Sequence, residues 1–210
     1  MRLTWTRGII PHGYLCDTPV HLIYRVRGCG CVAELRRLAD EAAQQYKLLR
    51  KLGTMPPAEL QSLITERMEA YDALLDAQDQ SKFPLAQPAF ARTILDSWMT
   101  LREREECRLY AVCVMGNHVH ALLAGSRGAG EIPIGSLVKR HKTFTDRELR
   151  SLHEGNASFW DPNFYDRYVR PGRFDIVLKY ILQNPVKAGL VKDWRDWTGT
   201  WVDKRCLGRV

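Results

Sequence analysis

Two β-like runs joined by a very short connector constrain the fold of this chain more than any other feature. The runs RLYAVCVM (108–115) and HVHALLA (118–124) are separated only by Gly116-Asn117. A two-residue Gly-Asn connector favours a β-hairpin, because glycine readily takes the positive φ angle that such turns need. The chain is therefore predicted to contain an antiparallel hairpin.

The remaining elements follow from apolar periodicity and from the Gly and Pro residues that interrupt it. The last helix is expected to end at Asn184, since a residue that precedes a proline is pushed away from helical angles. The order predicts an α+β fold, a ferredoxin-like antiparallel sheet with helices packed on one side. The expected elements are a strand at 20–27, helices at 34–52, 58–78 and 89–106, the hairpin, a flexible connection at 125–133, a basic helix at 134–151, a short strand at 163–170 and a helix at 173–184.

Length and composition favour one domain over residues 1–210. Residues 30–80 are interpreted as a helical elaboration, and 185–210 as a basic, Trp-rich C-terminal segment. No run of about 18 apolar residues occurs, so no contact with a membrane is expected. The first residues lack the pattern of a signal peptide, and the six cysteines lack framework spacing. We therefore expect reduced thiols and a cytoplasmic location.

The charge of the chain is unevenly distributed. The formal net charge is +7, and residues 137–210 hold fifteen Lys or Arg against nine Asp or Glu. A basic region of this kind suits a polyanionic partner, although solubility alone is an equally good explanation of so modest an excess.

The second run of the hairpin holds two histidines that either pack in the fold or form half of a metal site. Side chains alternate along a strand, so His118 and His120 point to the same face. A third ligand must come from elsewhere, and Tyr180 and Asn184 are spaced i, i+4 on one predicted helix, where Asn184 offers an amide oxygen. Two imidazoles and a neutral amide leave the charge of a divalent ion uncancelled, which suits a phosphodiester substrate. A nearby cation also favours the phenolate of Tyr180, and this arrangement indicates covalent phosphoryl transfer to tyrosine.

These motifs resemble those of a known family. VMGNHVHALL, followed by YILQNPVKAGLV, is similar to the HUH single-tyrosine (IS200-like) transposases and, more narrowly, to the REP-associated tyrosine transposases of bacteria. The resemblance covers most of residues 10–203. One departure is Gly116, where the family usually has proline.

The resemblance implies a function and roles for particular residues. Such enzymes cut single-stranded DNA with a divalent metal, Mg²⁺ or Mn²⁺, and leave a 5′-phosphotyrosine link and a free 3′-hydroxyl. Carried over by position, His118, His120 and Asn184 are metal ligands and Tyr180 is the nucleophile. The partner is expected to be single-stranded or hairpin DNA, and the protein a monomer or homodimer.

Several basic and aromatic residues are candidate DNA contacts. The basic helix is expected to lie near the cutting site, and Arg170 and Arg173 flank the turn into the tyrosine helix, where they either hold the scissile phosphate or pair with aspartates. The C-terminal tryptophans either stack on bases or pack within the fold. The predicted nucleic-acid contacts are Lys139, Arg140, Lys142, Arg147, Arg170, Arg173 and Lys187, and the tryptophans are Trp194, Trp197 and Trp201.

Other interpretations remain open at this stage. The chain is alternatively a non-catalytic nucleic-acid-binding regulator on the same fold, or a metal-dependent hydrolase or nickase that activates water. Tyr165 and Tyr168 are rival nucleophiles, although strand aromatics commonly pack. The N-terminal set His12, Cys16, His21, Cys29 and Cys31 fits no standard zinc pattern.

Overall fold

The computed structural model describes residues 12–29, 32–52, 57–128, 130–150 and 158–210. Within these ranges, no helix is both long enough and apolar enough to span a membrane. The strands are β1 (Tyr14–Leu15), β2 (Val20–Arg25), β3 (Arg108–Val114), β4 (His118–Ala124), β5 (Ile132–Pro133), β6 (Tyr165–Tyr168) and β7 (Thr200–Val202). The α-helices are α1 (Val32–Leu52), α2 (Pro57–Asp76), α3 (Pro88–Glu103), α4 (Ile134–Arg150) and α5 (Phe174–Lys187), with short 3-10 helices at η1 (Gln80–Lys82), η2 (Pro84–Ala86), η3 (Trp194–Asp196) and η4 (Lys204–Arg209).

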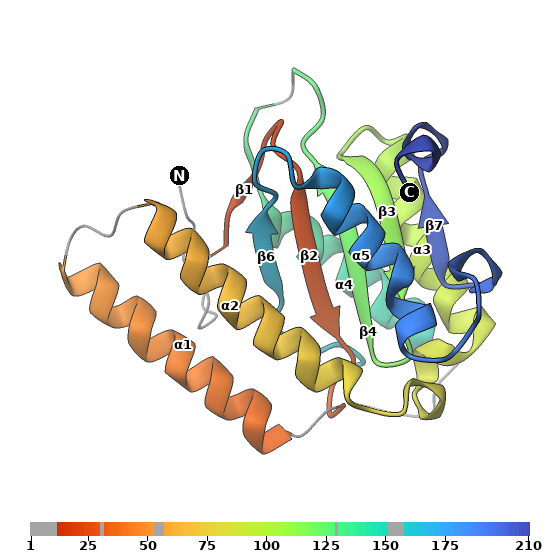
Figure 1. Ribbon diagram of the computed structural model, residues 1–210, viewed down its shortest axis with the longest axis horizontal. Helices are drawn as coiled ribbons and strands as arrows, with labels where there is room; N and C mark the ends of the chain where they lie inside the picture. Colours follow the sequence, from red (N-terminus) through yellow and green to blue (C-terminus); the bar gives the residue numbers. More distant parts are fainter. Residues whose placement is uncertain (1–11, 30–31, 53–56, 129, 151–157) are drawn as a thin grey trace.

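A five-stranded antiparallel sheet of order β6-β2-β4-β3-β7 forms the centre of the molecule (Figure 1). The predicted hairpin is confirmed as β3 and β4, and the α+β class is confirmed with it. In the central pair, Arg25 of β2 lies opposite His118, and Ile23 lies opposite His120. This register places the side chains of alternate β2 residues on the same face as the two histidines.

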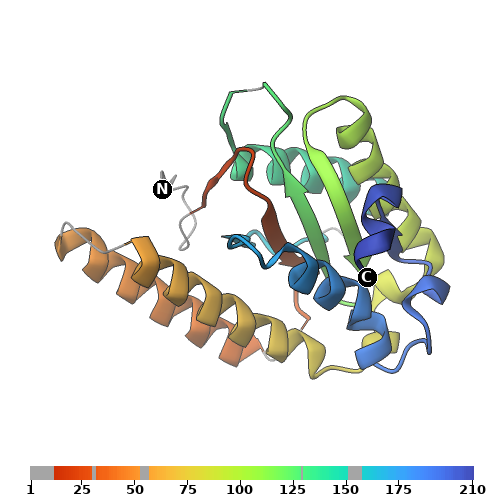
Figure 2. The same cartoon turned by 45° about the horizontal axis from the view of Figure 1, so that its top comes forward.

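Helices cover both faces of this sheet, so the expectation of helices on one side is wrong (Figures 1 and 2). Helices α3 and α4 pack on one face, and α2 and α5 pack on the other. The strands β2, β3 and β4 are buried over almost their whole length because both of their faces are covered. The helical elaboration, α1 and α2, forms an antiparallel pair that runs beyond the β6 edge (Figure 1).

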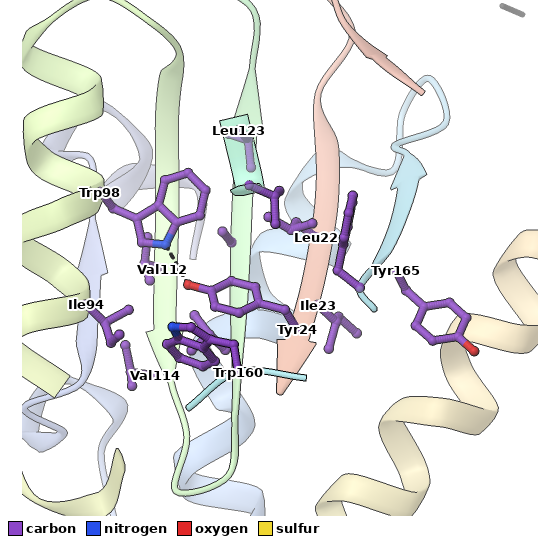
Figure 3. Packing of buried hydrophobic residues seen from close by; sticks show 14 of the residues in the cluster. Leu22, Ile23, Tyr24, Ile94, Trp98, Val112, Val114, Leu123, Trp160 and Tyr165 are labelled. Carbon is purple, nitrogen blue, oxygen red and sulfur yellow. Dashed lines mark hydrogen bonds between the residues drawn. The ribbon is translucent and has the colours of Figure 1, made fainter. Parts of the chain in front are cut away.

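A continuous core of aromatic and aliphatic side chains fills the α3/α4 face and extends past β6 to α2 (Figure 3). Tyr24 of β2 is fully buried there, and the indole Nε1 of Trp98 donates to its hydroxyl at 2.9 Å. Burial of these large side chains stabilises the fold, at roughly 25 cal/mol per Å² of apolar surface removed from water.

Helix α5 does not end at Asn184, so that expectation is wrong. It continues through Pro185 to Lys187, and the N–H of Ala188 donates to the carbonyl of Asn184 at 2.9 Å. A proline in the last turn of α5 removes one helical hydrogen bond, and the burial of the Pro185 side chain offsets part of that loss. The consequence is that Tyr180 and Asn184 keep a regular i, i+4 relation on one helix face.

The sequence suggested that Gly116 is needed for a positive φ angle, and the structure gives a different reason. Gly116 is not among the described residues with positive φ. Instead, a Cβ at Gly116 would lie 1.8 Å from the backbone oxygen of Gln80, so the turn passes directly against η1. This close approach ties the β3–β4 turn to the end of α2.

Three strands were not expected. β1 and β5 form a small antiparallel ladder, and β5 lies in the segment interpreted as a flexible connection. β7 comes from the Trp-rich C-terminal segment and pairs with β3 as an edge strand. Strands of two or three residues are too short for an alternation pattern to identify.

Candidate functional site

The two histidines of β4 lie on the α2/α5 face and are completely buried. Their Nε2 atoms are 2.9 Å apart, so both aim at the same point. The other ring nitrogen of each is held by a second polar group. Nδ1 of His118 lies 2.5 Å from Oδ1 of Asn117, and Nδ1 of His120 lies 3.1 Å from Nε2 of His21.

The hydrogen bonds of Asn117 fix the protonation of His118. The amide nitrogen of Asn117 donates to the carbonyl of Leu75 at 3.1 Å, which turns the amide oxygen toward the imidazole. Nδ1 of His118 must then carry the proton, and Nε2 presents a lone pair. Burial lowers the pKa of His118 and of His120 to about 3, so both rings are neutral, as metal ligands must be.

Helix α2 brings two carboxylates to the same point. Oδ1 of Asp72 lies 3.7 Å from Nε2 of His118 and 3.5 Å from Nε2 of His120. Oδ1 of Asp76, one turn later, lies 3.6 Å from Nε2 of His118. Burial raises the pKa of Asp72, and burial together with Asp72 raises that of Asp76 to about 7.

These donors fit a divalent cation. One atom each from Asp72, His118 and His120 can be chosen so that all three lie within 4.8 Å of one another. Oδ1 of Asp72 and Oδ1 of Asp76 are buried without a hydrogen-bond donor among the described residues. Buried acceptors of this kind cost free energy unless a cation or a donor satisfies them, and imidazole with carboxylate is a common ligand set for divalent metals.

Tyr180 of α5 reaches the same carboxylate. Its hydroxyl donates a hydrogen bond to Oδ2 of Asp72, whereas Oδ1 is the oxygen that lies near the histidines. The ring lies edge-on to His120, with centroids 6.0 Å apart, and the ammonium of Lys187 lies 4.0 Å from the centre of the ring. Burial and the charge of Asp72 raise the pKa of Tyr180, so the hydroxyl is protonated in this arrangement.

Asn184 lies one turn beyond Tyr180 and is buried. Neither its amide oxygen nor its amide nitrogen has a hydrogen-bond partner in the described part of the chain. An unpaired buried amide is costly, so its partner is to be sought in a ligand or an ion. Its predicted role as a metal ligand stays a prediction, whereas Asp72 lies within reach of both histidines.

A groove of about 480 Å³ opens beside these groups between α2 and α5. Its floor includes His21, Asp72, Asp76 and Tyr180. Its rim is basic and carries Arg167, Arg170, Arg173 and Lys187, of which all but Arg167 were predicted as nucleic-acid contacts. Arg167 also pairs with Glu69 of α2 at 3.0 Å. A cluster of imidazoles and carboxylates that can hold a cation, beneath a cationic rim, is suited to a phosphodiester.

Residues 84–184 match the family model described as "Transposase IS200 like". The match spans 101 of the 210 residues, just under half of the chain, and this segment is IS200-like. The matched segment contains His118, His120, Tyr180 and Asn184, but it begins after Asp72 and Asp76. The chain is thus a transposase, an enzyme that acts on DNA.

A solved structure shares the fold of this transposase. The structure of the REP-associated tyrosine transposase bound to a REP hairpin matches with a TM-score of 0.54 and 13% sequence identity, over 93% of this chain and 80% of that one. A protein from Deinococcus radiodurans R1, named as a candidate transposase, is less similar in structure, with 15% identity over 82% of this chain and 94% of its own and a TM-score of 0.40. No curated protein sequence matches the chain.

The basic helix of the transposase lies away from the groove, so its expected position near the cutting site is wrong. It is α4, which packs with α3 on the opposite face of the sheet (Figure 2). Lys139, Arg140 and Arg147 are exposed there, and Arg140 and Arg147 pair with Glu106 and Glu148.

The ammonium of Lys142 is bound within the fold. It donates to the carbonyls of Asp161 at 2.8 Å and Asn163 at 2.9 Å, and burial lowers its pKa to about 7. Lys139 and Arg140 are exposed, but position 142 falls on the side of α4 that meets the loop before β6. Neighbouring positions of α4 differ in exposure because a helix turns once every 3.6 residues.

The rival aromatic residues have structural roles. Tyr165 packs on Tyr71 of α2 with ring centroids 4.3 Å apart, and the hydroxyl of Tyr168 donates to the carbonyl of Tyr14 at 2.7 Å. Trp194 is buried, and the Trp197 indole donates to the carbonyl of Val114 at 2.8 Å. Trp201 is half-buried in β7 beneath Arg102. These contacts favour packing of the tail over base stacking.

The N-terminal His and Cys residues do not form a metal cluster within the described residues. His12 pairs with Asp166 at 2.5 Å, Cys29 donates to the carbonyl of Val26, and His21 joins His120 instead. Cys31 lies outside the described residues.

Sequence reasoning missed Asp72 and Asp76. They stand in YDALLDAQ, and their i, i+4 spacing on the predicted 58–78 helix was a readable signal of one shared face. Nothing in the sequence indicated that this face would be turned toward β4.

Proposed function

We propose that this transposase cuts and rejoins single-stranded DNA through a covalent bond between Tyr180 and a 5′-phosphate. One observation carries the proposal: the Tyr180 hydroxyl and the Nε2 atoms of both β4 histidines converge on a single buried carboxylate, that of Asp72. Nucleophile and electrophilic site must lie this close if one phosphate is to be attacked and stabilised at once.

The chemistry is a transesterification. The Tyr180 oxygen attacks the phosphorus and forms a P–O bond, the bond to the 3′ oxygen breaks, and a 3′-hydroxyl leaves with a proton. The reverse attack by a 3′-hydroxyl rejoins DNA and restores the tyrosine. The phosphotyrosine conserves the broken phosphodiester, so no nucleotide cofactor is required.

A divalent cation, Mg²⁺ or Mn²⁺, fits the donors that meet at this point. His118, His120 and Asp72 would hold it, with Asn184 as a further proposed ligand. When bound, the cation supplies charge neutralisation for the pentacoordinate phosphate. Asn117 and His21 keep the two imidazoles oriented through their second nitrogens, as partners of metal-bound histidines commonly do.

The substrate proposed is hairpin-forming repeat DNA with a single-stranded segment in the groove. Its support is the fold shared with a transposase solved on a REP hairpin, together with the basic rim. Arg170, Arg173 and Lys187 would contact phosphates of the scissile segment. Lys139, Arg140 and Arg147, on the opposite face, would contact DNA outside the groove. Membership of the REP-associated group is part of the same proposal.

The decisive experiment is cleavage of labelled single-stranded hairpin pools with Mg²⁺ or Mn²⁺, with adducts resolved on a denaturing gel and mapped by mass spectrometry. We expect an adduct on Tyr180 that disappears in Tyr180→Phe and in the His118→Ala/His120→Ala double variant. Tyr165→Phe is the matched control, because it removes a hydroxyl from a rival tyrosine outside the groove, and it should retain the adduct.

Two results would replace the proposal. Metal-dependent cleavage without any adduct would mean that water is the nucleophile, as in a hydrolase. Tight hairpin binding with neither cleavage nor adduct would mean a non-catalytic DNA-binding regulator.

A further inference from the structure

Asp72 uses its two carboxylate oxygens for different purposes. Oδ2 accepts the hydrogen bond from Tyr180, while Oδ1 accepts none and faces the Nε2 atoms of His118 and His120. The carboxylate therefore stands between the nucleophile and the donors of the proposed cation site, and it touches both.

A purely structural role does not account for Asp72. The side chain is about 4% exposed, yet across the described ranges no Lys or Arg nitrogen lies within 4.0 Å of its carboxylate. A buried carboxylate that faces neutral imidazoles and a phenol destabilises a fold relative to an apolar residue. Such a group is more typical of a functional site than of a core.

The position of Asp72 is fixed from both sides. At the C-terminal end of α2, the carbonyl of Leu75 accepts from the amides of Gln80, at 2.7 Å, and of Asn117, at 3.1 Å. Because Asn117 also holds His118, α2 and the first histidine are coupled through one side chain. On the other side, Tyr71 packs on Tyr165 of β6.

We propose that Asp72 is a positioning residue that links occupancy of the cation site to the placement of the Tyr180 hydroxyl. The α1–α2 hairpin is then part of the reaction centre, although it lies outside the segment that matches the family model. The inference rests on the proposed function in taking Tyr180 as the nucleophile. It adds a residue from another element and a coupling between two sites.

The coupling predicts a spectroscopic signature. With 3-fluorotyrosine at position 180, we expect Mg²⁺ to shift the ¹⁹F resonance of the wild-type chain. The reason is that a cation bound at Asp72 changes the hydrogen bond that the same carboxylate accepts from Tyr180. Asp72→Asn should lose that shift at a Mg²⁺ concentration that calorimetry shows to be saturating. Glu66→Gln is the matched control, since it makes the same charge change on an exposed position of α2, and it should keep the shift.

Reciprocity gives a second test that does not depend on the folding of an Asp72 variant. If Tyr180 and the cation share one carboxylate, removing the Tyr180 hydroxyl must change the affinity of the site for the cation. We expect Tyr180→Phe to bind Mn²⁺ at least about fivefold more tightly by electron paramagnetic resonance titration, as coupled sites commonly show. Tyr165→Phe should bind Mn²⁺ as the wild type does.

The outcomes separate this inference from the proposed function. An unchanged Mg²⁺-induced shift in Asp72→Asn, or an unchanged Mn²⁺ affinity in Tyr180→Phe, overturns the inference even if the adduct on Tyr180 forms. Absence of the adduct in the wild type overturns the proposed function, while the shift and the affinity change would still establish the coupling.

Discussion

Both faces of the central sheet bury histidine side chains, but the polar groups around these histidines are hydrogen-bonded on one face, and on the other several lack a partner among the described residues. On the α3/α4 face, Nε2 of His141 accepts from the Tyr24 hydroxyl at 2.6 Å, and Nδ1 donates to the Ser97 hydroxyl at 2.8 Å. The Tyr24 hydroxyl in turn accepts from the indole of Trp98, so both ring nitrogens of His141 and the Tyr24 hydroxyl have hydrogen-bond partners.

On the α2/α5 face the polar groups converge and stay unsatisfied. Buried atoms without a hydrogen-bond partner among the described residues include Oδ1 of Asp72 and Asp76, Nδ1 of His21 and both amide atoms of Asn184. The comparison teaches that burial alone does not mark a functional histidine. The mark is a set of acceptors that share one space and lack donors, because folding would otherwise have paired them.

The largest expected difference between the faces is in chemistry. Replacing His118 and His120 by alanine should lower the rate of adduct formation by about 10³-fold or more, the scale of losing a principal catalytic group. Replacing His141 by alanine should leave the rate of the folded protein near that of the wild type. The measurement is single-turnover adduct formation below the melting temperature of each variant, and a comparable loss in His141→Ala would remove the distinction between the faces.

The next effect is on stability in acid. Burial, and then Lys142, lowers the pKa of His141 to about 3, against about 6.5 in an unfolded chain. The unfolded state thus takes up a proton first, so the stabilisation is complete above about pH 6.5 and is lost as the pH falls toward 3, at up to about 1.4 kcal/mol per pH unit.

Urea unfolding at a series of pH values tests this expectation. His141→Gln should be less stable at pH 7 but should show a flatter decline in acid, by about one bound proton. A decline as steep as that of the wild type would show that His141 is not held neutral.

A smaller effect, on the free energy of unfolding, is expected at the β3–β4 turn, which contacts η1. Gly116→Ala would place a Cβ against the Gln80 carbonyl, and overpacking of this kind costs about 1–3 kcal/mol of unfolding free energy. Because Asn117 adjoins it, we also expect weaker Mn²⁺ binding. Gly130→Ala, which meets nothing within 4 Å, is the control. Equal unfolding midpoints for the two variants would argue against the close approach.

The smallest effect separates the basic residues of the two faces. Arg173→Ala should reduce the salt dependence of single-strand binding by about 0.7 in the slope of log K against log salt, the contribution of one phosphate contact. Lys142→Met should leave that slope unchanged, because the Lys142 ammonium is bound by backbone carbonyls. Filter binding across a salt series measures both, and a reduced slope in Lys142→Met would return that residue to the DNA surface.

The local elements of this protein were readable from its sequence. Alternation and the Gly-Asn connector identified the β3–β4 hairpin, and apolar periods of 3.6 residues identified the five α-helices. Both patterns depend only on residues that are close together in the sequence. The same patterns put His118 and His120 on one face and Tyr180 and Asn184 on another, and a resemblance in these motifs indicated the family.

Tertiary structure alone decided which of these faces meet. Helices on both sides of the sheet, the short strands β1, β5 and β7, and the inward turn of Lys142 all depend on packing between segments far apart in the chain. Asp72 is separated from His118 by more than forty residues, and its carboxylate reaches the histidines only because α2 packs against β6. Periodicity specifies the side of a helix that will be buried, but the partner of that side is chosen by the whole fold.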